Sequence, residues 1–179
     1  MNQSLSFRPA LSADSLLAAP VLAALRVVPW ADQVEVAEID PALSDTAQFC
    51  AAYGISLDDS VNCVIITGKR GGEVKYAACM ITATTRANVN GVVRQHLDVR
   101  KASFGPVDTV TALTGMEYGG ITPVGLPDSW PVLVDDRVAG LPGVIIGSGI
   151  RGSKLRLPGR LLAELPGGKV LPGLGVAAS

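Results

Sequence analysis

The stretch VNCVIITGKRGGEVKYAACMITA, residues 61–83, decides the fold of this chain. Val61–Thr67 and Val74–Ala83 are two apolar runs rich in β-branched residues, and three of the six residues between them are glycines. Apolar runs of this kind, joined by a short glycine-rich connection, are typical of a β-hairpin. We therefore expect two antiparallel strands here, with the rest of the domain built around them.

Elements on both sides of the hairpin follow from hydrophobic spacing, capping residues and glycine or proline positions. Before it, we expect a loose leader (Met1–Pro9), a helix from Ser12–Asp14 toward Arg26, a half-buried strand (Gln33–Ile39) and a helix from Ser44 to Tyr53. After it, we expect helices at Asn88–Leu97, Asp108–Leu113 and Pro158–Leu165, strands at Val99–Ser103, Pro131–Val134 and Val144–Ile146, and a fraying tail. Interleaved strands and helices with a hairpin predict an α+β fold, with a mixed, partly rolled sheet of about six to seven strands and flanking helices. The length fits a single domain over residues 1–179.

The charge is unevenly placed along the chain. Residues 1–60 hold two basic and eight acidic residues, whereas residues 61–179 hold thirteen basic and eight acidic residues. This is either ordinary surface solvation or a sign that the later segment faces a polyanion. Only 4% of the residues are aromatic, which argues against a broad base-stacking platform. No apolar run approaches the length of a membrane span, so we expect a cytoplasmic protein without a membrane partner.

Cysteine and histidine are too sparse for most catalytic or metal motifs. Cys50, Cys63 and Cys79 are scattered without a CxxC pair, which favours reduced, buried thiols. His96 is the only histidine, so motifs that need two are excluded and a Ser-His-Asp triad is disfavoured. We expect neither a metal ion nor another cofactor.

The loop TGMEYGGITPVG, residues 114–125, is the most unusual segment of the sequence. Its glycines permit positive φ angles and a close approach of backbone N–H groups to a ligand oxygen, and Pro123 fixes the end of the turn. Several N–H groups directed at one carbonyl oxygen are the electrostatic requirement for acyl transfer or ester hydrolysis. The alternative interpretation is a tight connection between two strands.

This loop is one of four motifs that, taken in their order along the chain, resemble those of a known family. TAQFCAAYGI (residues 46–55) precedes the hairpin, and the glycine loop is followed by PVLVDD (131–136) and by the Gly-x-Arg-Gly piece at Gly149–Gly152. From about Thr46 to Leu165 the chain resembles the YbaK/EbsC-type, prolyl-tRNA synthetase-associated editing domains, which places an editing-domain-like core at residues 28–170. The resemblance implies a free-standing deacylase that hydrolyses, in trans, the ester between a mischarged amino acid and the 3′ end of tRNA. A synthetase or an elongation factor is the expected protein partner.

The resemblance also implies the residues of the site. Backbone amides of the Gly119–Pro123 segment would face the substrate carbonyl, while the terminal ribose hydroxyl assists an attacking water. The implied catalytic residues are Asn62, Gly119, Gly120, Ile121 and Pro123; the implied substrate-binding residues are Thr114, Gly115, Lys101, Ser148, Gly149 and Arg151; and Arg86 and Lys154 are expected to contact the tRNA backbone.

One departure from the family pattern affects the expected chemistry. Asn62 stands where the family carries a lysine near the start of the first hairpin strand, and a carboxamide donates hydrogen bonds without that charge. Asn62 either orients the acyl group or terminal adenosine, or is a polar residue near a strand end. Lys75 or Lys101 is a candidate to replace the missing charge, unless each is an ordinary solvated lysine. Two other functions stay open: a binding module that has lost hydrolysis, and a hydrolase of another small acyl ester.

Overall fold

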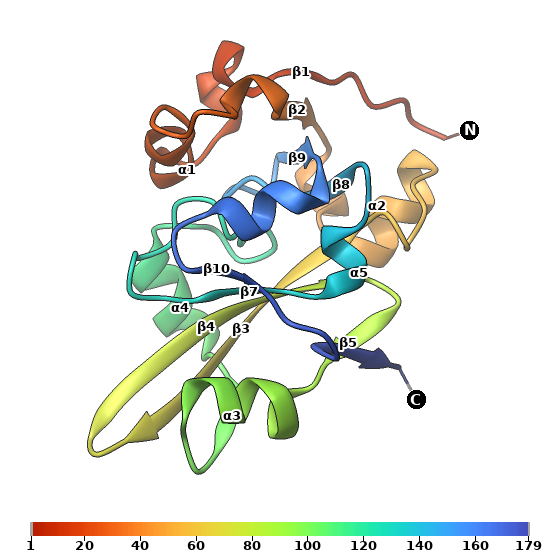
Figure 1. The fold of residues 1–179 in the computed structure, drawn as a ribbon. Helices are drawn as coiled ribbons and strands as arrows, with labels where there is room; N and C mark the ends of the chain where they lie inside the picture. Colours follow the sequence, from red (N-terminus) through yellow and green to blue (C-terminus); the bar gives the residue numbers. More distant parts are fainter. Residues whose placement is uncertain (1, 179) are drawn as a thin grey trace.

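The computed structural model describes residues 2–178, and three sheets organise it (Figure 1). A five-stranded mixed sheet has the order β10 (Gly168–Val170), β7 (Val132–Val134), β4 (Glu73–Thr82), β3 (Val61–Arg70) and β6 (Ala102–Phe104). A four-stranded antiparallel sheet has the order β1 (Arg8–Pro9), β2 (Glu35–Glu38), β9 (Ser153–Leu157) and β8 (Val144–Gly147). Strands β11 (Gly175–Ala177) and β5 (Thr85–Ala87) form a separate antiparallel pair.

The β3–β4 hairpin is confirmed, and it is longer than its apolar runs. The antiparallel register continues to Arg70 opposite Glu73, so only Gly71 and Gly72 form the turn. Their φ angles are +57° and +82°, and a two-residue turn of this kind requires positive φ at both central positions. Glycine meets that requirement without steric cost, which lets the charged residues at positions 69 and 70 stay in the strand.

Both faces of the central sheet are covered, which explains why residues 77–81 are apolar at every position. Ala78 and Met80 face the main core, whereas the alternate residues Ala77, Cys79 and Ile81 face a second cluster. That second cluster is completed by side chains from α3 and from the C-terminal segment, including Leu97 and Leu174. A strand with two buried faces reads as a continuous apolar run rather than as an alternating one.

The two larger sheets join at the start of β3. Ser60 forms a parallel bridge with Ile145, and the Ile145 N–H donates to the Asp59 carbonyl at 2.9 Å. This junction curves the strands around the main core, so the predicted mixed, partly rolled α+β architecture is confirmed. The described residues hold more strands than the six or seven expected: β9, in which Leu155 and Leu157 alternate with Lys154 and Arg156, was overlooked, and β1, β5, β10 and β11 have only two or three residues, too few to show a pattern.

The helices are short, and the first one begins later than predicted. They are α1 (Ala19–Leu25), α2 (Thr46–Tyr53), α3 (Arg94–Leu97), α4 (Val107–Thr114) and α5 (Asp136–Ala139). Residues 10–16 form two separate 3-10 turns instead of the first half of a helix, and Pro20 lies in the first turn of α1. Proline is tolerated only in that first turn, which fixes where the helix starts. Asp14 caps no α-helix; it forms an ion pair with Arg26 at 3.0 Å.

Four further expectations about regular structure need correction. Residues 89–93 of the helix expected at Asn88–Leu97 form a π-helical turn, and the last expected helix is a 3-10 helix over Gly159–Glu164. The leader is not loose, because Arg8 and Pro9 pair with β2 and the Gln3 N–H donates to the Ala52 carbonyl at 2.9 Å. The tail does not fray either; it forms β10 and β11.

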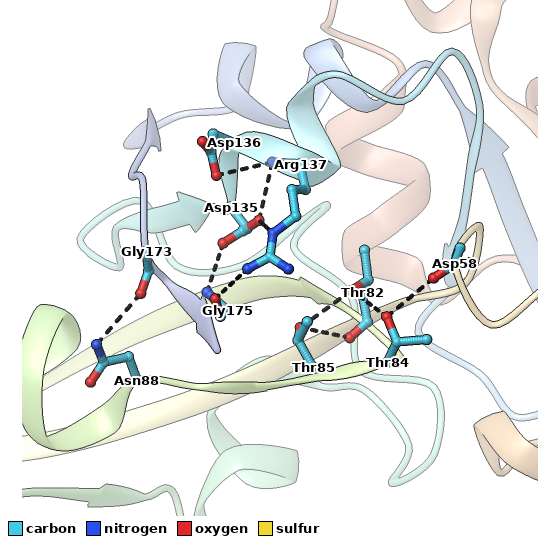
Figure 2. A network of polar contacts seen from close by, with 10 residues as sticks. All are labelled: Asp58, Thr82, Thr84, Thr85, Asn88, Asp135, Asp136, Arg137, Gly173 and Gly175. Carbon is cyan, nitrogen blue, oxygen red and sulfur yellow. Dashed lines mark hydrogen bonds and ion pairs between the residues drawn. The ribbon is translucent and has the colours of Figure 1, made fainter. Parts of the chain in front are cut away.

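A buried carboxylate holds the tail in place (Figure 2). Asp135, with its side chain 3% exposed, accepts a hydrogen bond from the Gly175 N–H at 2.7 Å and pairs with Arg137 at 3.3 Å. Arg137 in turn donates to the Gly175 carbonyl at 2.7 Å. Asp135 is therefore satisfied on both oxygens and connects the end of β7 to β11. Its role is structural rather than acid–base, since both oxygens are occupied.

Candidate active site

A cavity of about 520 Å³ lies where β3 begins. Its wall comes from the start of α2, the first residues of β3, the glycine loop, the end of β8, and the segment that leads into β9. The lining residues are Ser44, Asp45, Thr46, Ser60, Val61, Asn62, Cys63, Val64, Tyr118, Gly119, Ile121, Ile145, Ile146, Gly147, Arg151 and Lys154. The strand carrying Asn62, the glycine loop and Arg151 thus meet at one place.

The cavity exists because one side of β3 is only half covered. Strand β6 pairs with β3 from Ile66 to Gly68, and residues 61–64 have no partner on that edge. Asn62 belongs to this stretch, and it lines the cavity.

The Asn62 carboxamide is held in a defined orientation. Its Oδ1 accepts a hydrogen bond of 2.7 Å from the Thr46 hydroxyl on the first turn of α2. Because the oxygen is engaged by Thr46, the carboxamide NH2 group remains to donate to a ligand in the cavity. Asp45 caps α2 through its bonds to the Ala47 and Gln48 N–H groups, and this cap positions Thr46 at the cavity wall.

The glycine loop offers two N–H groups rather than three. The Gly120 N–H donates to the Glu117 carbonyl at 3.0 Å and is therefore not available to a ligand. Within residues 2–178, the N–H groups of Gly119 and Ile121 have no hydrogen-bond acceptor, and both residues line the cavity. Two unpaired N–H groups separated by one residue can stabilise a single carbonyl oxygen.

Gly120 instead allows two loops to pack closely. A Cβ at position 120 would lie 2.6 Å from the Ile150 carbonyl carbon, and one at Gly147 would lie 2.6 Å from the Gly120 oxygen. The Gly149 N–H closes the contact by donating to the Gly120 carbonyl at 2.7 Å. These three glycines hold the Gly119 and Ile121 amides in place, and the N–H groups of Gly120 and Gly149 donate to carbonyls of the protein itself.

Lys154, which was expected to contact the tRNA backbone, is a buried cation in the lining of the cavity rather than part of an exposed surface. The residue is 8% exposed; its Nζ donates to the Ser44 carbonyl at 3.1 Å and lies 5.2 Å from the centre of the Phe49 ring. Burial removes the ammonium from water and thereby lowers the pKa of Lys154. With one donor used on Ser44, the ammonium has two left for a ligand.

Arg151 is the second cation among the residues that line the cavity. Its guanidinium donates to the carbonyls of Tyr118 at 3.1 Å and Pro41 at 3.2 Å, and its backbone N–H donates to Glu117 Oε1 at 3.2 Å. The arginine therefore ties the glycine loop to the segment before α2. Glu117 is used in the same connection and does not line the cavity.

The remaining expected site residues lie outside the cavity lining. Thr114 and Gly115 end α4, with the Thr114 hydroxyl donating to the Val110 carbonyl at 2.7 Å and Gly115 at a φ of +68°. Ser148 is fully buried and bonded to Ser153 at 2.6 Å. Three further residues do not reach the site: Pro123 is buried in the core, and Lys101 and Arg86 are exposed elsewhere.

Residues that sequence reasoning missed are Thr46, Ser44 and Phe49, which position Asn62 and Lys154. The capping residue Asp45 predicts where α2 begins, and that start could have indicated Thr46. No local pattern indicates that Ser44 and Phe49 would surround a lysine more than 100 residues later.

The cavity lining that the structure describes contains one thiol, Cys63, and no imidazole. Burial raises the pKa of this thiol, as it raises that of Cys79 to about 12, so both stay protonated near neutral pH. His96 lies in a different depression beside Tyr76 and Trp130. Over residues 2–178, no cluster of three or more His, Cys, Asp or Glu side chains is arranged to hold a metal ion. None of the helices in the same range is long and apolar enough to span a membrane.

Comparison with known proteins agrees with the fold. A family model described as the aminoacyl-tRNA editing domain matches residues 40–165, which is more than half of the chain. The chain belongs to the aminoacyl-tRNA editing domain family.

Solved structures share the fold at low sequence identity. A crystal structure of a proposed trans-editing enzyme for prolyl-tRNA synthetase aligns over 87% of this chain and 94% of its own, with a TM-score of 0.73 and 21% identity. A scaffold protein from a study of computational epitope grafting aligns over 87% and 95%, with a TM-score of 0.72 and 22% identity. A hypothetical protein aligns over 74% and 85%, with a TM-score of 0.65 and 25% identity. The search of curated proteins returned no significant match.

Proposed function

We propose that the protein hydrolyses the ester bond between a mischarged amino acid and the 3′ end of tRNA, acting in trans. Membership of the editing-domain family supports this class of substrate. The observation that carries the proposal is the meeting of four donor groups in one cavity: the unpaired amides of Gly119 and Ile121, the Asn62 carboxamide, and the Lys154 ammonium. Such a set stabilises negative charge on oxygen.

The reaction proceeds by direct attack of water on the ester. The water oxygen forms a bond to the carbonyl carbon, and the carbonyl oxygen becomes an oxyanion held by the Gly119 and Ile121 N–H groups. The bond from carbon to the ribose 3′ oxygen then breaks. The proton removed from the water passes to that oxygen through the neighbouring 2′ hydroxyl, which leaves a free amino acid and uncharged tRNA.

The cavity lining supports a role for the ribose hydroxyl as the proton carrier. Asp45 is the one carboxylate among the lining residues, and it is committed to capping α2. Cys63 stays protonated because burial raises its pKa. The described lining therefore supplies donors and positive charge but no free base, and the substrate's own hydroxyl fills that role.

Lys154 supplies the positive charge that Asn62 lacks. Both side chains line the same cavity, one from β3 and the other from β9. In a poorly hydrated site a fixed ammonium acts more strongly on a developing oxyanion than it would in water. In this proposal Asn62 orients the acyl group by donating a hydrogen bond, and Lys154 provides the charge.

The test is deacylation of 3′-labelled aminoacyl-tRNAs charged with Ala, Ser, Cys or Pro. Wild type is compared with Lys154→Met and Asn62→Lys, with Arg8→Glu on the edge strand β1, outside the cavity lining, as a control. Turnover of at least one species that Lys154→Met reduces and Arg8→Glu preserves supports the proposal. No turnover by wild type, together with recovery in Asn62→Lys, identifies a binding module that has lost its catalytic charge.

A further inference from the structure

A group of basic side chains surrounds the tip of the β3–β4 hairpin, far from the cavity. Lys69 and Arg70 come from the end of β3, Arg94 from α3, and Arg100 from the turn before β6. They line a depression of about 550 Å³, in which Asp98 is the one acidic residue. Lys101 adds a further exposed basic residue next to Arg100, and Glu73 is the nearest acid on β4.

Part of this basic surface is held in place by the protein itself. Arg70 forms an ion pair with Asp98 and donates to its carbonyl at 3.2 Å, while Arg94 donates to the Asn90 carbonyl at 2.9 Å. Lys69 and Arg100 are exposed and have no ion-pair partner within residues 2–178. The group therefore contains more basic than acidic side chains, and two of the basic ones, Lys69 and Arg100, are free to bind an anionic partner.

The hairpin tip itself is open to a large partner. Gly71 and Gly72 have no other atom within 4 Å of the position where a Cβ would lie. Figure 1 shows the hairpin extending past β7 and the rest of the five-stranded sheet, with α3 beside it. A rigid double helix can approach this end without meeting the body of the domain.

The distance between the hairpin tip and the cavity indicates which kind of partner can contact both. Asn62 and Arg70 are eight residues apart on one continuous strand, which is roughly 26 Å at the usual rise of a β-strand. A small ester in the cavity cannot reach that far. A nucleic acid whose 3′ end occupies the cavity places its double-helical part at this range, with one phosphate charge for about every 1.7 Å of duplex axis.

We propose that the basic hairpin tip binds the phosphate backbone of the double-helical acceptor region of tRNA while the charged 3′ end occupies the cavity. This proposal rests on the proposed function. The tip lacks aromatic side chains in its lining, so the contact is with phosphates and does not read base identity. The two contacts at the ends of one strand would distinguish aminoacyl-tRNA from small aminoacyl esters.

The test compares a long and a short substrate in charge-reversal variants. Lys69→Glu and Arg100→Glu are made singly and together, and the controls Arg8→Glu and Arg160→Glu reverse two exposed arginines on other elements. The substrates are aminoacyl-tRNA and the corresponding 3′-aminoacyl-adenosine. We expect the double tip variant to lose roughly tenfold in kcat/KM on aminoacyl-tRNA near 0.1 M salt and to keep its activity on aminoacyl-adenosine.

Binding of uncharged tRNA provides a readout that does not depend on turnover. Weaker binding by the tip variants than by the controls, at unchanged melting temperature, supports the proposal. Equal losses in tip and control variants overturn it, because they indicate only a general effect of net charge. If neither ester is hydrolysed but the tip variants still bind tRNA more weakly, the catalytic proposal fails and the docking surface stands. Tip variants that match wild type on both substrates overturn the docking surface alone.

Discussion

The two ends of strand β3 carry positive charge in opposite ways. Beside Asn62, Lys154 is 8% exposed, bonded to a backbone carbonyl and packed over an aromatic ring. Beside Arg70, several basic side chains stand in solvent with few partners. A buried charge costs desolvation energy but acts strongly on a nearby atom, whereas exposed charges cost little and act weakly and over a longer range. These properties fit the two proposed roles, with catalysis at the end of β3 near Asn62 and binding of the tRNA phosphates at the end near Arg70.

The largest expected effect comes from separating the glycine loop from the segment around Ile150, which pack against each other beside the cavity. Gly120→Ala places a Cβ 2.6 Å from the Ile150 backbone, so the glycine loop must move. We expect a loss of about 2 kcal/mol in the free energy of unfolding and roughly a hundredfold loss in kcat, because the amides shift from the substrate. Gly143→Ala is the control, since nothing lies within 4 Å of its Cβ position. Equal behaviour of the two variants in denaturation and deacylation assays would contradict this account.

Removing the buried charge should separate activity from stability. Lys154→Met keeps the apolar stem over Phe49 and removes the ammonium. We expect deacylation to fall roughly tenfold to a hundredfold. The free energy of unfolding near neutral pH should stay equal or rise, because a buried charge with a lowered pKa destabilises the folded state. Urea denaturation beside single-turnover kinetics measures both, and a stable variant with full activity would remove Lys154 from the mechanism.

Salt should distinguish the exposed end from the buried one. Raising salt from about 0.05 M to about 0.2 M should lower kcat/KM on aminoacyl-tRNA by roughly tenfold if two phosphates are contacted at the tip. The same change should leave hydrolysis of 3′-aminoacyl-adenosine nearly constant, because the cavity is screened much less. The Lys69→Glu, Arg100→Glu double variant should show a shallower salt dependence on tRNA. An unchanged slope would place the phosphate contacts elsewhere.

The smallest effect is a pH dependence that only Lys154 should produce. Desolvation lowers its pKa below the ordinary lysine value of 10.5, so activity that needs the charged form should decline as pH rises through the lowered value. In the same range the folded protein has released a proton that the unfolded chain still binds, so the free energy of unfolding rises with pH up to about 10.5. Lys154→Met should show neither trend. Rates are corrected for spontaneous ester hydrolysis.

Local sequence patterns predicted the β3–β4 hairpin and the position of the glycine loop well. The β-branched runs on both sides of Gly71-Gly72 led to β3 and β4, and Asp45 with Gly54 marked both ends of α2. The glycine loop and Arg151 were brought to one cavity with Asn62, as expected. These features depend on neighbouring residues, which a sequence displays directly.

The remaining features depend on contacts between distant residues. Lys154 was expected on the surface, because nothing nearby in the sequence shows that Ser44 and Phe49 cover it. The availability of the Gly119 and Ile121 amides, but not of Gly120, depends on one hydrogen bond to Glu117. Strands β10 and β11 were missed because their residues are mostly glycine, valine and lysine in short runs, which stabilise a strand only when a partner is already in place.

The buried carboxylate of Asp135 also bears on how the chain folds during its synthesis. Its partner amide belongs to Gly175, and β11 pairs with β5 across nearly 90 residues of sequence. The ribosome synthesises the N-terminal part first. Residues 85–87 and Asp135 are therefore made before β11, which supplies their hydrogen-bond partners. Until Gly175 emerges, a charged group lies at the edge of an otherwise finished core. The nascent domain is therefore expected to stay open at this edge, and to close only after β11 leaves the ribosome.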